Sequence, residues 1–113
     1  MWTKILNIAT HPELAKYSLG KVHLSYTAHA QARSVEKNIN IQAIELISAG
    51  SIVEIETLGT AVTKIVARLA HDSEYDKVLV LVPVNKVSYR VITCWLNHKL
   101  DMHKTLNKER LSA

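Results

Sequence analysis

Val78-Leu79-Val80-Leu81-Val82-Pro83-Val84 is the stretch of sequence that decides the fold. A short apolar run rich in valine predicts a strand buried on both faces, which we place over residues 76–84. The run is far shorter than the roughly 20 apolar residues that span a bilayer, so we expect no membrane association. The chain should therefore build its core around a sheet that contains this strand.

Strand signals continue on both sides of this run. Residues 51–57 are rich in β-branched side chains, and residues 87–95 alternate in polarity, which places Tyr89, Val91, Thr93 and Trp95 on one face. Residues 61–70 fit either an amphipathic helix or a strand. We favour a strand because it completes a four-stranded antiparallel meander with turns at 58–60 and 85–86.

Helix signals lie before Gly50. Thr10-His11-Pro12-Glu13 resembles a capping box and predicts a short helix to residue 19. Residues 26–37 carry apolar side chains at helical spacing, and a third helix is predicted from an N-cap at Asn40 to Gly50. These patterns predict one α+β domain over 1–113, with N-terminal helices (about 1–50) packed on a four-stranded antiparallel sheet (about 51–106) and a short C-terminal tail.

Composition narrows the class of protein. Hydrophobic residues make up 48% of 113 residues, with three Gly and two Pro, which excludes a mainly disordered chain. The net charge of +4 permits an anionic partner such as RNA but is equally compatible with an ordinary solvated surface. The single cysteine, Cys94, excludes an internal disulfide and a zinc site of paired thiolates, and it favours the cytoplasm.

The residues offer few catalytic patterns. No phosphate-binding glycine loop, zinc-protease, serine-hydrolase or calcium-loop motif is present. His29 and Arg33 lie four residues apart on a predicted helix, which would suit phosphate chemistry, although Arg33 could equally pair with Glu36 or Glu45. We expect no metal at His98, Asp101 and His103, and we interpret Cys94 as a packed core residue.

Three segments carry a family resemblance: Tyr26-Thr27-Ala28-His29-Ala30-Gln31-Ala32-Arg33, the isoleucine-rich stretch ending at Gly50, and Val91-Ile92-Thr93-Cys94-Trp95-Leu96-Asn97 running to His103-Lys104-Thr105-Leu106. They resemble small bacterial toxin-like domains of unknown function in the BECR group, which comprises barnase, EndoU, colicin and RelE-like ribonucleases. The resemblance covers most of the chain. It implies helices packed on a four-stranded sheet and a toxin-type endoribonuclease that cleaves RNA by transesterification without metal or cofactor. The chain departs from the toxin pattern by lacking a large delivery region, so we expect a free-standing cytoplasmic protein.

The resemblance also implies a set of site residues. Its motif positions suggest the catalytic residues His29, Arg33, Thr93 and His103, with the two histidines exchanging protons. Independently of the resemblance, the separated cations on the predicted strands and tail would border one RNA-binding groove if the sheet is antiparallel, although they could also form a solvated sheet face. The residues predicted to bind RNA are Lys64, Arg68, Arg90, Lys104 and Thr105. The expected partners are RNA and a cognate inhibitor, an antitoxin or immunity protein. The sequence leaves open an alternative without catalysis, in which a mobile genetic element encodes an RNA- or protein-binding module that modulates a host protein.

Overall fold

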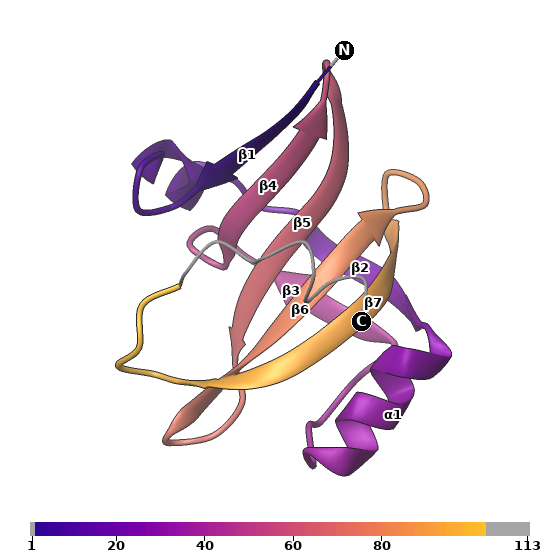
Figure 1. The fold of residues 1–113 in the computed structure, drawn as a ribbon. Helices are drawn as coiled ribbons and strands as arrows, with labels where there is room; N and C mark the ends of the chain where they lie inside the picture. The colour runs from indigo at the N-terminus through magenta and orange to yellow at the C-terminus, as the bar shows by residue number, and fades with distance from the viewer. Residues whose placement is uncertain (1, 104–113) are drawn as a thin grey trace.

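A computed structural model describes residues 2–103, and it contains a seven-stranded sheet in the order β1-β4-β5-β6-β7-β2-β3. Figure 1 shows the sheet with α1 beside β7 at one end of the molecule and a short 3-10 helix, η1, near β1 and β4. The elements are β1 (Thr3–Asn7), η1 (Pro12–Lys16), β2 (Gly20–Tyr26), α1 (Ala28–Glu36), β3 (Ile44–Ile47), β4 (Ile52–Leu58), β5 (Ala61–Ala70), β6 (Tyr75–Pro83) and β7 (Ser88–His98).

The middle of the sheet is an antiparallel meander, β4-β5-β6-β7. Residues 61–70 form a strand, which settles the ambiguity of that segment. At the centre of the meander, Val78, Leu79, Val80 and Leu81 are fully buried. This burial on both faces explains the continuous apolar run, because a central strand has no side that meets water.

Three further strands extend the meander on both sides. β1 pairs antiparallel with β4, β2 runs parallel to β7, and β3 closes the other edge against β2. The prediction of N-terminal helices packed on a four-stranded sheet is therefore wrong. Within residues 2–103 the first half of the chain contributes three strands, one α-helix and the single turn η1.

The predicted third helix, over residues 40–50, is the largest error. Its residues Ile44–Ile47 form β3, which pairs with β2 from Gly20↔Ile47 to His23↔Ile44. Isoleucines three residues apart satisfy helical spacing, but as a strand the segment pairs its backbone with β2 and places Ile47 in the main core. The segment therefore adopts strand geometry, in which Ile47 is buried, because tertiary pairing outweighs local propensity.

The first predicted helix is also shorter than expected. Thr10 does not act as its N-cap, because the Thr10 hydroxyl donates to the Asn7 carbonyl at 3.2 Å. His11 occupies the cap position without a capping side-chain hydrogen bond, and η1 ends at Lys16. The predicted second helix is present as α1, whose N-cap Thr27 accepts a hydrogen bond from the Ala30 amide.

A bulge in β7 changes which side chains share a face. Val80 pairs with Thr93 and Leu81 with Val91, so Ile92 has no partner. The bulge shifts the alternation by one residue, and Cys94 joins Tyr89 and Val91 in the core. The predicted face of Tyr89, Val91, Thr93 and Trp95 is therefore split, since Trp95 packs on the opposite side of the sheet against Val78 and Val80.

The sheet curls around its main core. That core brings Val22, Leu24 and Ile47 of β2 and β3 together with Ile52 and Ile65 of β4 and β5 in one cluster. We call this side of the sheet the concave face and the side that carries Trp95 the convex face. No helix within residues 2–103 is long and apolar enough to cross a membrane.

Candidate functional site

The α1–β7 site consists of His29, Arg33 and Thr93. The Nε2 atom of His29 lies 3.3 Å from the Thr93 hydroxyl, although 64 residues separate the two in sequence. α1 follows β2 directly, and the Thr27 hydroxyl donates to the Ile92 carbonyl at 3.2 Å, which fixes the start of the helix against the β7 bulge. His29 is exposed, so the imidazole is open to solvent beside a half-buried hydroxyl.

Arg33 lies one helical turn after His29, on the same side of α1. Its guanidinium group is 3.6 Å from the Glu36 carboxylate, and its side chain is 43% exposed. An exposed pair of this kind is weak, so an incoming phosphate can compete with Glu36 for the guanidinium. The site thus offers an imidazole, a hydroxyl and a guanidinium.

Cys94 lies beneath α1, and its thiol donates to the Ala30 carbonyl at 3.6 Å. It is buried, as the sequence predicted. Burial raises the pKa of the Cys94 thiol, while the nearby cations Arg33 and Lys77 oppose that shift without cancelling it. A protonated, buried thiol is a poor nucleophile. Cys94 therefore packs α1 onto β7 and adds no chemistry to the α1–β7 site.

His103 lies outside the α1–β7 site. Its Nε2 atom is 3.1 Å from the Glu54 carboxylate, and both side chains are about 5% exposed. Glu54 belongs to β4, and the register Glu54↔Val66, Val66↔Val80 and Val80↔Thr93 puts it on the row of Thr93. Three strand spacings separate the two residues, or about 14 Å along the sheet. His29, Arg33 and Thr93 are brought together, and His103 is not.

Of the cations expected to bind RNA, the structure describes Lys64, Arg68 and Arg90. Lys64 lies 3.8 Å from the Glu56 carboxylate on the neighbouring strand. Arg90 is exposed on β7, opposite Val82 of β6. Lys104 and Thr105 lie outside the described residues.

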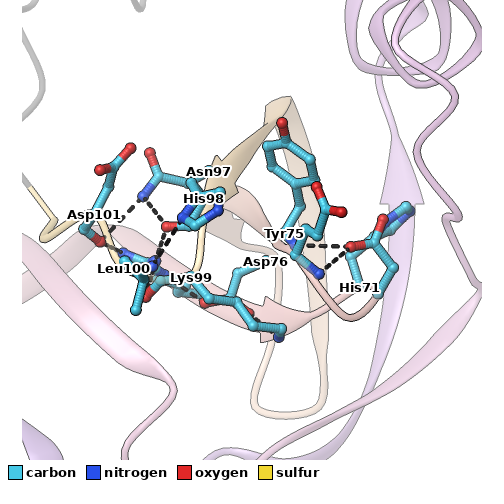
Figure 2. Close-up of polar contacts among 11 residues, drawn as sticks. His71, Tyr75, Asp76, Asn97, His98, Lys99, Leu100 and Asp101 are labelled. Atoms are coloured by element: carbon cyan, nitrogen blue, oxygen red, sulfur yellow. Dashed lines mark hydrogen bonds and ion pairs between the residues drawn. The ribbon is translucent and has the colours of Figure 1, made fainter.

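Arg68 serves a structural role that the sequence did not reveal. Its guanidinium group donates to the Asp76 carboxylate at 2.7 Å and to the carbonyls of His98 and Asp101 at 2.8 and 2.6 Å. Lys99 donates to the other Asp76 oxygen at 2.7 Å. We call these five residues the C-terminal clasp. Figure 2 shows how the end of β7 and the residues that follow it gather beside Asp76.

The C-terminal clasp has an electrostatic signature at Asp76. Burial raises the pKa of the Asp76 carboxyl, but hydrogen bonds from Lys99 and Arg68 outweigh burial and leave the pKa below its ordinary value. Because these bonds already occupy Arg68, it is not free to hold a phosphate. The clasp instead anchors the segment that follows β7.

The sequence also did not predict a buried ion pair on the concave face. Lys77 of β6 donates to the Glu45 carboxylate of β3 and, at 2.8 Å, to the Asn40 carbonyl. Tyr26 donates to the Gln42 carbonyl at 2.6 Å, and burial together with the charge of Glu45 raises its pKa to about 12, although the Gln42 bond opposes the shift. The sequence signal for this ion pair was Lys77 itself, because it is a charged residue directly before the buried apolar run of β6.

Within residues 2–103, His, Cys, Asp and Glu side chains form no group of three that could hold a metal ion. No family model, curated protein or solved structure matches the chain.

Proposed function

We propose that this protein acts on RNA at the α1–β7 site, as a cytoplasmic, metal-independent, toxin-type ribonuclease that works by transesterification. The observation that carries the proposal is the contact between His29 Nε2 and the Thr93 hydroxyl. A surface imidazole fixed by a neighbouring group, with a guanidinium one turn away, is suited to proton transfer beside a phosphate. The motif resemblance to BECR ribonucleases also supports RNA as substrate, although the fold expected from it is absent.

The proposed chemistry assigns one role to each residue. Thr93 accepts a hydrogen bond from His29 Nε2–H, which fixes the tautomer and leaves Nδ1 free to take the proton of a ribose 2′-hydroxyl. The 2′-oxygen forms a bond to phosphorus and the bond to the 5′-oxygen breaks, giving a 2′,3′-cyclic phosphate. The leaving oxygen takes a proton from water, and the hydroxide left behind takes the proton held by His29, which restores the neutral imidazole. Arg33 stabilises the charge that develops on the phosphate.

The test compares matched histidine variants on RNA in the presence of a chelator. His29→Ala should lower the cleavage rate by about 10²- to 10⁴-fold, the usual contribution of general base catalysis. His23→Ala is the control, because His23 is also exposed but lies on β2. Equal activity of the two variants, or RNA left intact by the wild-type protein, would exclude His29 as the base.

The position of His103 favours a second candidate, binding of RNA or protein without cleavage. Pairing with Glu54 removes the second proton carrier that the resemblance implied. Under this alternative the α1–β7 site holds its partner through Arg33, and a mobile element could use it to modulate a host protein. RNA binding that weakens in Arg33→Gln, with no cleavage in the wild type, would select this candidate. A cognate inhibitor protein would, under either candidate, cover the same site.

A further inference from the structure

A cavity of about 500 Å³ lies between η1 and the concave face of the sheet. Leu14 and Tyr17 contribute one wall, and Ile55, Val62, Ile65 and Tyr89 contribute to the other. The cavity has no part in the α1–β7 site, since none of its lining residues belongs to α1. Its volume falls within the range of about 300 to 1,000 Å³ that is typical of small-molecule sites.

The lining defines the chemistry of an occupant. The described residues contribute no charged side chain to the walls, and most of the lining is aliphatic. A charged group in such a place would lose its hydration without gaining a partner, so the occupant is uncharged. A cavity of 150 Å³ holds one benzene ring, so about 500 Å³ has room for roughly two or three fused rings or a branched chain of similar size.

Tyr89 supplies a second, independent observation. Its side chain lines the cavity and the residue is only 8% exposed. Among residues 2–103 no group forms a hydrogen bond with the Tyr89 hydroxyl, whereas the Ser18 hydroxyl in the same wall is bonded to the Ile47 carbonyl and the Gly20 amide. No buried side-chain oxygen or nitrogen among the described residues lacks a hydrogen-bond partner, so the Tyr89 hydroxyl is accessible to solvent and can bond to a ligand that enters the cavity.

We propose that this cavity binds an uncharged, mainly apolar small molecule of two or three rings or equivalent size, with one hydroxyl or carbonyl group that bonds to Tyr89. Binding replaces water that has few partners against the aliphatic walls, which is favourable. The proposal is independent of activity on RNA.

The test uses N-phenyl-1-naphthylamine, an uncharged probe whose fluorescence increases in apolar surroundings. The wild-type protein should bind it, and Val62→Trp should weaken binding at least tenfold, because Val62 is a 42% exposed residue of the wall and a larger ring there fills the cavity. Val84→Trp is the control, since Val84 is 59% exposed and outside the lining. Equal binding by both variants, or none by the wild type, would overturn the proposal.

The role of Tyr89 is tested with two probes that differ by one hydroxyl. Tyr89→Phe should weaken binding of 1-naphthol about three- to tenfold, the value of one hydrogen bond, and leave naphthalene unchanged. Equal effects on both probes would remove the hydrogen bond from the proposal. In the wild type, 1-naphthol should shift the NMR methyl signals of Ile55 and Ile65. Concentration-dependent dimerisation relieved by Val62→Trp would assign the cavity to a second copy of the chain and overturn the proposal.

Discussion

Removing Glu45 should destabilise the protein strongly, because its carboxylate partners a buried lysine across the curled sheet. The Lys77 side chain is 5% exposed and the Glu45 side chain 13% exposed. Breaking a buried pair by removing one partner typically costs 3 to 5 kcal/mol. The Asn40 carbonyl still accepts from Lys77 in Glu45→Gln, so we expect the lower value, about 3 kcal/mol.

This magnitude translates into a measurable melting shift. With an unfolding entropy of about 2.1 cal/mol/K per residue, 113 residues give about 0.24 kcal/mol/K, so Glu45→Gln should lower Tm by about 12 °C. The double variant Lys77→Met/Glu45→Leu should stay within about 1 kcal/mol of the wild type, because neither charge is left buried alone. Calorimetry and urea unfolding measure both quantities.

The control is the exposed pair of Arg33 and Glu36, whose side chains are 43% and 57% exposed. Glu36→Gln should change the free energy of unfolding by no more than about 0.5 kcal/mol. Suppose that Glu45→Gln lowers the free energy of unfolding as little as Glu36→Gln does. The ion pair of Lys77 and Glu45 is then not formed, and the curled arrangement that brings β3 to β6 is contradicted.

Three further outcomes are expected from the clasp and the core. Arg68→Lys should lower the free energy of unfolding by about 2 kcal/mol, measured in urea, because an ammonium group cannot replace the forked donors to Asp76 and two carbonyls. The low pKa of Asp76 adds stability that is present above the ordinary carboxyl value of 3.8 and is lost as pH falls below it, so Asp76→Asn should flatten the acid limb of a stability–pH profile. Cys94 should react with iodoacetamide at pH 8 far more slowly in the folded protein than in urea, and equal rates would contradict its burial beneath α1.

The sequence predicted the meander because its signals are local. β-branched runs and intervening turns placed β4, β5, β6 and β7 close to their observed bounds. Apolar side chains at helical spacing likewise identified α1. In these elements the residues contact their sequence neighbours or the next strand along the chain. Local sequence patterns and tertiary contacts therefore favour the same secondary structure.

The sequence did not reveal features that depend on distant pairing. β3 is a strand because it pairs with β2, and the spacing of side chains between residues 40 and 50 does not show that pairing. The bulge at Ile92 likewise depends on register against β6, and it reversed the expected face of Cys94. The position of His103 also depends on a distant contact, because its partner Glu54 lies 49 residues earlier in the sequence.

The central claim is that β2 and β3 extend the sheet and thereby hold α1, with His29, against Thr93. NMR spectroscopy of the labelled protein tests it in one set of spectra. We expect strand-like Cα and Cβ shifts over residues 44–47, together with a nuclear Overhauser contact between the His29 ring and the Thr93 methyl group. Helical shifts over residues 44–47 without that contact would contradict both the fold and the site.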